Sequence, residues 1–337
     1  MDDLCAAPLV SVIMPVYNAE EYLKESVGSV LGQTYPGIEL ICFNDASTDG
    51  SLSLLRSFAE ADSRLRIMDS VVNVRQGGGR NRALRAAHGR FVMFLDADDA
   101  LADDAVRLCV EAAMRENADM VVFDYVRNFP SLGKKEPVCQ LGTDAAALRG
   151  DALRERLIER ITPVWSAMYD KSLITDNGLF FPENVFYEDN AVALAIQLSA
   201  RNPVKLNALL YNYRCDNASV TRSVNNYRFF DRLSSAVALM ENLRRLGLYD
   251  RFAAQLDFLF LNQYYIHTIF GCIYRFEKVP MMRLRYVLGT VGRYVKNHRS
   301  NPYYRKQSVA MKLKIESHAR FPRVIKFLSV SKRRIFG

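Results

Sequence analysis

The chain has 337 residues, half of them apolar and about a quarter charged, which is typical of a globular protein with a sizeable core. No uninterrupted apolar stretch reaches the length of a membrane span, and the N-terminus lacks the basic and apolar regions of a signal peptide. The six cysteines are widely scattered, and no pair has metal-ligand or redox spacing. We therefore expect a cytoplasmic protein with reduced thiols.

The net charge of +8 is unevenly distributed along the chain. Residues 275–337 contain 17 Lys or Arg and two acids, whereas the other 28 basic residues are outnumbered by 35 acids. A mildly acidic body therefore carries a strongly basic C-terminal region. Such a region attracts anionic surfaces: phospholipid, nucleic acid or a polyanionic partner.

Strand-like and helix-like segments alternate through the first 126 residues. Apolar runs rich in β-branched or aromatic residues predict strands at residues 9–14, 38–43, 65–68, 91–95 and 120–126. Amphipathic patterns predict helices at residues 20–32, 51–61, 80–87 and 103–117. This alternation predicts an α/β fold, in which a largely parallel sheet has helices on both faces. The loops that follow successive strands then share one edge of the sheet.

The pattern becomes less regular after residue 126. We expect an exposed excursion, a helix, an extended segment and a strand at residues 128–142, 143–160, 178–187 and 204–213, respectively. From about residue 227 the pattern is helical. We therefore expect a first domain of residues 1–225 and a helical, basic region of residues 226–337.

The most informative stretch is residues 91–99. Five apolar residues, Phe91 to Leu95, predict a strand buried on both faces, and Asp96, Asp98 and Asp99 follow it directly. The carboxyl ends of strands in open α/β sheets face the ligand crevice. Clustered carboxylates repel one another unless a cation lies between them, which indicates a divalent metal with oxygen ligands. The alternative is a turn followed by a helix start, where Asp is also common.

Three ordered motifs resemble those of family 2 glycosyltransferases. They are residues 10–18 (VSVIMPVYN), residues 44–50 (NDASTDG) and residues 96–99 (DADD). The resemblance covers residues 8–125 strongly, and a later motif at Glu188 and Asp189 matches less tightly. It implies a GT-A fold, a nucleotide-sugar donor and inversion of anomeric configuration. On this basis residues 1–126 form a donor half and residues 127–225 an acceptor half.

The resemblance assigns donor-binding roles to four residues. Asp45 would accept a hydrogen bond from the imide N–H of uracil, the alternative being a helix N-cap. Tyr17 would stack on the base or simply be a core or edge tyrosine. Asp98 would ligate Mn²⁺ or Mg²⁺, and Asp96 would contact the ribose and the metal shell. A metal bound to the diphosphate would stabilise the charge that develops on the leaving group.

Residues 76–81 (QGGGRN) match the loop that precedes the third helix in the family. Glycine-rich backbone before a helix resembles a phosphate cradle, because it presents free N–H groups. The stretch is neither a Walker loop nor a dinucleotide fingerprint, since both need other spacings. Arg80 would contact the donor or the carboxylates at the sheet edge, and a structural salt bridge is the alternative.

Glu188 and Asp189 are the candidate catalytic pair. Inversion by direct displacement needs a carboxylate that takes the proton of the acceptor hydroxyl. The resemblance assigns that role to Asp189, with Glu188 orienting it or an acceptor hydroxyl. The alternative is an acid pair that stabilises a helix N-terminus.

Weaker assignments concern Trp165 and the loop that follows the predicted strand at residues 204–213. Trp165 is either a stacking platform for an acceptor sugar or a core residue. Arg214, Ser219 and Arg222 lie in a loop that the family often folds over the diphosphate, as a mobile lid.

The basic C-terminal region has three interpretations. Between residues 317 and 337, apolar residues alternate with Lys and Arg as in a helix lying on an anionic membrane. A solvated helical face and a homo-oligomer contact are the alternatives. No nucleic-acid-binding motif accompanies the charge, so we expect no nucleic-acid partner. The membrane interpretation predicts a peripheral position at the inner face of the membrane.

The sequence therefore predicts a metal-dependent inverting glycosyltransferase. It would move a hexosyl or N-acetylhexosaminyl group from a UDP-sugar to a hydroxyl of a glycan or lipid-linked acceptor, in bacterial surface polysaccharide synthesis. The alternative from another class is a non-catalytic nucleotide-sugar or glycan-binding module on the same fold. A nucleotidyltransferase would need a glycine-rich loop with Lys or Arg after the first strand, and residues 15–18 (PVYN) do not supply one.

Overall fold

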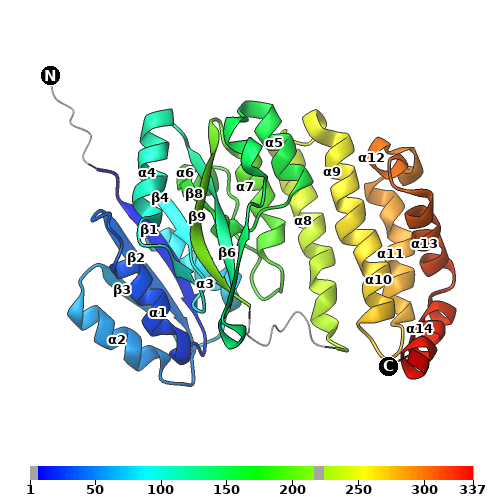
Figure 1. Cartoon of the computed structure of the whole chain (residues 1–337), viewed down its shortest axis with the longest axis horizontal. Coiled ribbons are helices and arrows are strands. Elements are labelled where there is room, and N and C mark those ends of the chain that lie inside the picture. Colours follow the sequence, from blue (N-terminus) through cyan, green and yellow to red (C-terminus); the bar gives the residue numbers. More distant parts are fainter. Residues whose placement is uncertain (1–6, 216–223, 337) are drawn as a thin grey trace. The chain divides into compact units, whose positions relative to one another are not determined.

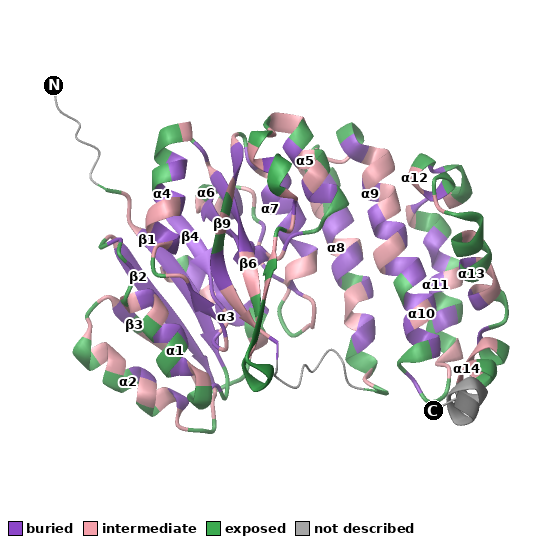
Figure 2. Ribbon diagram, viewed as in Figure 1, coloured by how far each residue is buried: buried purple, intermediate pink, exposed green. Residues whose placement is uncertain are grey.

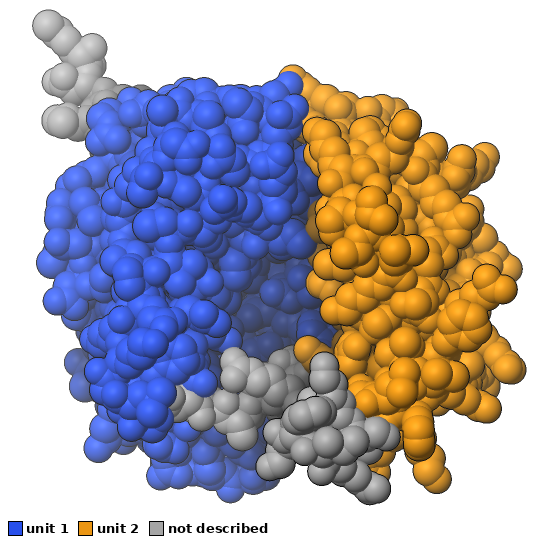
Figure 3. Space-filling model, turned by 45° about the vertical axis from the view of Figure 1, so that its right-hand side comes forward, with its two compact units in different colours: residues 1–217 blue, residues 218–337 orange. Residues whose placement is uncertain are grey.

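The computed structural model describes residues 7–215 and 224–336, with side chains described as far as residue 329. The chain divides into two compact units, residues 1–217 and residues 218–337, which Figure 3 colours separately. Within the described residues, no helix is both long enough and apolar enough to cross a membrane.

The first unit is built on one mixed sheet, which contains nine strands in the described residues (Figure 1). Along the sheet the strands follow the order β3-β2-β1-β4-β8-β6-β9-β5, and β7 pairs with β6. β1 to β4 are parallel neighbours, as are β6 and β9, whereas β8 runs antiparallel to β4 and β6. The strands are β1 (Val10–Val16), β2 (Ile38–Asp45), β3 (Leu65–Ser70), β4 (Phe91–Phe94), β5 (Ala100–Leu101), β6 (Met120–Phe129), β7 (Lys134–Val138), β8 (Ala167–Asp170) and β9 (Pro203–Arg214).

Helices flank this sheet, and the predicted α/β architecture is confirmed (Figure 1). Every residue of β1, β2 and β4 is buried, as expected for parallel strands covered on both faces (Figure 2). The helices are α1 (Glu20–Leu31), α2 (Ser51–Ala61), α3 (Arg75–Ala86), α4 (Ala105–Glu116), α5 (Gly150–Glu159), α6 (Ser172–Thr175) and α7 (Ala193–Ser199).

Two predictions for the middle of the chain were only partly right. Residues 128–142 are largely exposed, as predicted, but they are regular structure: β6 extends to Phe129 and pairs with β7 as a hairpin. Residues 143–160 do not form one helix: a 3₁₀ turn (Thr143–Ala147) precedes α5, and Leu148 between them is extended. Gly150, with φ of +54°, marks this break, because few other residues adopt that conformation without strain.

The glycine run at residues 77–79 was also placed wrongly. It lies inside α3, which begins at Arg75, and all three glycines are buried. A Cβ on Gly77 would lie 2.3 Å from the carbonyl oxygen of Pro182, and one on Gly79 would lie 2.9 Å from the Phe43 ring. These glycines therefore allow α3 to pack closely against the sheet and residue 182, and they do not form a loop before the helix.

The second unit is helical in its described residues, as the sequence predicts (Figure 1). A π-helical turn (Leu261–Ile266) joins α9 to α10, and aromatic rings fill much of the interior, for example Phe260 stacked on Tyr264 with ring centroids 4.8 Å apart. The helices are α8 (Asp231–Arg245), α9 (Ala253–Phe260), α10 (His267–Tyr274), α11 (Met281–Tyr294), α12 (Pro302–Arg305), α13 (Val309–Arg320) and α14 (Pro322–Phe336).

A buried carboxylate ties together the amino-terminal ends of β1, β2 and β4. Glu39 Oε1 accepts hydrogen bonds from Ser11 Oγ (2.6 Å), His88 N (2.7 Å) and Gly89 N (3.2 Å). Glu39 Oε2 pairs with the Arg66 guanidinium at 3.2 Å. Although burial opposes ionisation, these hydrogen bonds hold the pKa of Glu39 below its usual value.

We expect Glu39→Gln to lower the free energy of unfolding by about 1–2 kcal/mol at neutral pH, because a charge-assisted network is lost. Since the folded-state pKa of Glu39 is lowered, its contribution is present above the unfolded-state pKa and disappears as the pH falls through the folded-state value. Urea unfolding at neutral and acidic pH measures both effects. Glu60→Gln, at an exposed position of α2, is the control, and an equal effect of both variants would contradict the assignment.

Candidate active site

Three neighbouring parallel strands bring the predicted donor residues to one edge of the sheet. β1 lies between β2 and β4, with Val16 beside Asn44 and Ile13 beside Phe94. Tyr17, Asp45 and Asp96 lie at or just beyond the carboxyl ends of these strands. Parallel strands place such residues on a common edge, so residues up to about 80 positions apart in sequence meet there.

The loops after β1 and β2 hold each other in place. Asn18 Oδ1 accepts a hydrogen bond from Thr48 N at 2.8 Å, and Asp49 Oδ2 accepts one from Glu20 N at 3.1 Å. In return, Glu20 Oε2 accepts one from Gly50 N at 2.8 Å. Each loop therefore supplies acceptors to the N-terminus of the other loop's helix, which satisfies N–H groups that lack partners within the helix.

Asp45 is part of this edge and does not cap a helix. It is 3% exposed, and its Oδ1 accepts a hydrogen bond from Val74 N at 2.6 Å, just before α3. Its own carbonyl oxygen accepts one from Asn73 Nδ2 at 3.0 Å. The next residue, Ala46, has φ of +58°, so the chain turns sharply after the carboxylate. Tyr17 is 54% exposed, so its ring is a surface feature of the same edge and not a core side chain.

The turn after β4 is attached to β9 through its last acid. Asp99 Oδ2 accepts a hydrogen bond from Tyr211 Oη (2.7 Å), and Asp99 Oδ1 accepts one from Arg214 N (2.7 Å). Tyr211 Oη also accepts one from Asp96 N at 3.2 Å. Burial, together with the charges of Asp96 and Asp98, raises the pKa of Asp99 well above its usual value. Asp99 therefore anchors the turn, while Asp96 and Asp98 remain only partly buried.

Arg80 joins the acid motif after β4 to the acid pair at residues 188 and 189. Its Nη2 lies 2.7 Å from Asp96 Oδ1, and its Nη1 lies 2.6 Å from Glu188 Oε1. The side chain is 3% exposed, and its guanidinium carbon lies 5.4 Å from the centroid of the Phe181 ring. Although burial opposes its charge, Asp96, Glu188 and Asp189 raise the pKa of Arg80. The predicted contact of Arg80 with a carboxylate at the sheet edge is present, and it takes the form of the alternative, a structural salt bridge.

The acid pair occupies a constrained turn. Tyr187, immediately before it, has φ of +62°, which is unusual for a bulky residue. Asp189 opens a 3₁₀ turn (Asp189–Ala191) that precedes α7, so the predicted helix start is displaced to Ala193. Burial raises the pKa of Glu188 to about 7 despite the opposing charge of Arg80. Burial also raises the pKa of Asp189, again opposed by Arg80 and assisted by the charge of Asp96.

Asn81, the last residue of the QGGGRN motif, to which no role was assigned, fixes the segment that leads to this pair. Its Nδ2 donates to the carbonyl oxygen of Phe181 at 2.8 Å, and its Oδ1 accepts from Phe181 N at 2.9 Å. The amide of Asn81 thus pairs with both backbone groups of Phe181, as a neighbouring strand would. Its place in the QGGGRN motif was the signal in the sequence, but its partner, 100 positions away, was not readable from that motif.

Three weaker predictions have different outcomes. Trp165 is 8% exposed and stacks on Tyr211 and Tyr213, with ring centroids 4.3 and 5.5 Å apart, so the core alternative is favoured. Ser219 and Arg222 lie outside the described residues. Arg214 forms an ion pair with Glu25, and its Nε donates to the carbonyl oxygen of Asp98 at 3.1 Å.

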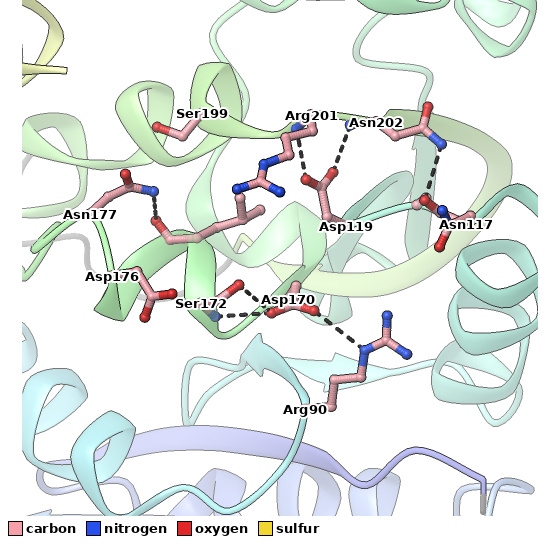
Figure 4. A pocket seen from close by; sticks show the side chains of 12 residues that line it. Arg90, Asn117, Asp119, Asp170, Ser172, Asp176, Asn177, Ser199, Arg201 and Asn202 are labelled. Atoms are coloured by element: carbon pink, nitrogen blue, oxygen red, sulfur yellow. Dashed lines mark hydrogen bonds and ion pairs between the residues drawn. The ribbon is translucent and has the colours of Figure 1, made fainter. Parts of the chain in front are cut away.

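A polar pocket of about 410 Å³ lies at the opposite edge of the sheet (Figure 4). It includes Arg90, which precedes β4, and Asp170, which is paired with Phe91 at the amino end of that strand. The polar groups there largely bind one another: Asp119 accepts hydrogen bonds from Arg201 N (2.7 Å) and Asn202 N (3.0 Å). This pocket is therefore separate from the edge that carries the acid motifs.

We expect Arg80→Met to lower the free energy of unfolding by about 3–5 kcal/mol, because buried Glu188 and partly buried Asp96 both lose their cationic partner. Arg82→Met is the matched control on the same helix. Its ion pair with Glu183 (3.3 Å) is partly exposed, so we expect a loss below about 1 kcal/mol. Urea unfolding measures both values, and equal losses would show that the buried bridge is not a main stabilising contact.

Comparisons with known proteins indicate the same family that the three sequence motifs resemble. Residues 11–168 match the model of glycosyl transferase family 2, which includes the strands β1 to β4 and the acid motif after β4. EpsH of Bacillus subtilis (strain 168), named as a glycosyltransferase, is 29% identical over 248 residues, which is 70% of each chain. WfgD of Escherichia coli, a UDP-Glc:α-D-GlcNAc-diphosphoundecaprenol β-1,3-glucosyltransferase, is 35% identical over 136 residues, 40% of this chain and 51% of WfgD.

Among solved structures, residues 1–349 of S. aureus TarS in complex with UDP-GlcNAc superpose with a TM-score of 0.59 at 20% identity. The superposition covers 89% of this chain and 93% of the TarS chain, and at this identity it supports the fold alone. The family model, the relatives and the fold agree with one another. Residues 11–168 belong to glycosyl transferase family 2, and the chain has the GT-A fold.

Proposed function

We propose that this protein is a metal-dependent inverting glycosyltransferase that transfers a hexosyl or N-acetylhexosaminyl group from a UDP-sugar. The acceptor would be a hydroxyl of a glycan or a lipid-linked glycan in bacterial surface polysaccharide synthesis. The observation that carries this proposal is the pairing of Arg80 with Asp96 and Glu188, at 2.7 and 2.6 Å. It places the acid motif after β4 close to the acid pair that could activate an acceptor.

The edge formed by β1, β2 and β4 would hold the donor. Asp45 has one oxygen bound to Val74 N, and its other oxygen would accept the imide N–H of uracil. The exposed ring of Tyr17 would stack on the base. The names of TarS, bound to UDP-GlcNAc, and WfgD, which uses UDP-Glc, support a UDP-sugar as the donor.

The acids after β4 fit a hard divalent cation, Mn²⁺ or Mg²⁺. Their carboxylate oxygens are the ligands that such ions prefer. The described residues contain no group of three or more His, Cys, Asp or Glu side chains arranged to hold a metal. Asp98 and Asp96 would therefore hold the ion together with donor phosphates, as is usual for Mg²⁺. When bound, the ion would stabilise negative charge on the departing diphosphate.

Asp189 would act as the general base. Its carboxylate would accept the proton of the acceptor hydroxyl while that oxygen forms a bond to the anomeric carbon and the bond from that carbon to the UDP oxygen breaks. The raised pKa of Asp189 makes its carboxylate a stronger base than that of a free aspartate. Glu188, held by Arg80, would orient Asp189. Attack opposite the leaving group accounts for inversion.

The acceptor assignment rests on the relatives. WfgD is named for a sugar acceptor linked to diphosphoundecaprenol, and the chain spans about half of its length. A lipid-linked acceptor would bring this protein to a membrane, as a peripheral protein at the cytoplasmic face.

We expect Asp189→Asn to reduce turnover at least about a hundredfold, because the base is lost, while UDP binding is retained.

We expect Asp98→Ala to abolish the Mn²⁺-dependent part of UDP binding as well as turnover. Calorimetric titration of UDP with and without Mn²⁺, and transfer assays with a panel of UDP-sugars, measure these effects.

Asp176→Asn, an exposed acid at the opposite edge of the sheet, is the matched control and should keep full activity. Full turnover in Asp189→Asn would refute the assignment of the base. UDP binding by the unmodified protein without transfer or hydrolysis of any UDP-sugar would favour the alternative, a non-catalytic binding module.

A further inference from the structure

The last helix, α14, exposes an apolar stripe. Val324, Phe327 and Leu328 are 55%, 70% and 56% exposed, and Phe321, just before the helix, is 51% exposed. Residues three and four positions apart lie on the same face of a helix, so these four side chains form one continuous stripe. Exposure of single apolar residues is ordinary, but a stripe of large ones indicates an interaction surface.

The stripe is not the face by which α14 packs on its own unit. α14 contacts α10 and α13, and Pro322 at its start is buried. Ile325 and Ser329 are both less exposed than the stripe. Together with Pro322 they lie on the side of the helix opposite Phe327, as the period of 3.6 residues requires. Figure 2 shows exposed positions on α13 and on the described first part of α14.

Positive charge surrounds this stripe. Arg320 and Arg323 are exposed, and Lys326 is partly exposed. The sequence adds Lys332, Arg333 and Arg334 in the last turns of the chain. Between residues 278 and 337 the sequence has a single acid, Glu316, which forms an ion pair with Arg299 at 2.9 Å. The positive charge around the stripe therefore greatly exceeds the negative charge of this part of the chain.

We propose that α14 docks on an anionic phospholipid bilayer. The stripe of Phe321, Val324, Phe327 and Leu328 would enter the boundary between headgroups and acyl chains, and the flanking Arg and Lys would bind lipid phosphates. A membrane surface offers apolar volume and negative charge together, which matches both features of α14. A second copy of the chain would bring like charges against one another in a symmetric contact, and a nucleic acid would leave the apolar stripe in water.

The test is co-sedimentation of the full chain with vesicles of phosphatidylglycerol and phosphatidylcholine, compared with vesicles of phosphatidylcholine alone. We expect binding to the anionic vesicles only, weakened by added salt. The triple variant Val324→Ser, Phe327→Ser, Leu328→Ser and the double variant Arg323→Glu, Lys326→Glu should each bind at least about tenfold more weakly. Circular dichroism and thermal unfolding establish that both remain folded.

Leu132→Ser with Lys135→Glu, at exposed positions of the β6–β7 hairpin, is the matched control and should bind like the unmodified chain. Absence of vesicle binding, equal binding to neutral vesicles, or unchanged binding by both α14 variants would overturn the proposal. So would a dimer in sedimentation velocity that the triple variant abolishes, because the stripe would then be covered by a second copy. Vesicle binding requires no donor and no turnover, so its failure is distinguishable from failure of the proposed transferase activity.

Discussion

The buried ion pairs of Arg80 are the contact on which the site depends. One guanidinium binds Asp96, which follows β4, and Glu188, which lies 92 positions further along the chain. The buried carboxylate of Glu188 and the partly buried one of Asp96 would otherwise repel each other, and burial alone would favour their neutral forms. The cation between them allows the acid motif and the acid pair to lie close together. Because a salt bridge of this kind is costly to desolvate, its value is in positioning as much as in stability.

The rest of the first unit supports that contact. The glycines of α3 let the helix approach the sheet and residue 182 closely enough for Arg80 to reach both acids. Asn81 then binds the backbone of Phe181, and Tyr211 binds Asp99, so both segments that carry acids are tied to regular secondary structure. A transferase needs its donor and acceptor groups in a fixed relation, because small displacements reduce the rate strongly. In the proposed transfer, these contacts would supply that relation.

The two units differ in chemistry. The first is mildly acidic and carries the family motifs at one edge of its sheet, whereas the basic excess and the exposed apolar stripe belong to the second. A donor site needs a rigid edge of sheet, and a membrane-docking surface needs only an amphipathic helix with basic residues. The proposed transfer to a lipid-linked acceptor would use both, one for chemistry and one for location.

The sequence by itself determined the strand at residues 91–95, the acids that follow it and the order of the family motifs, because these depend on local periodicity and spacing. It also indicated Arg80 as a residue of the site, but it did not decide between a contact to the donor or edge carboxylates and a structural salt bridge. Only the tertiary structure decided that the glycines at 77–79 lie inside a helix, that Trp165 is covered by tyrosines and that Asp99 binds Tyr211. Each of these depends on a partner more than 30 residues away, and no local pattern specifies such a partner.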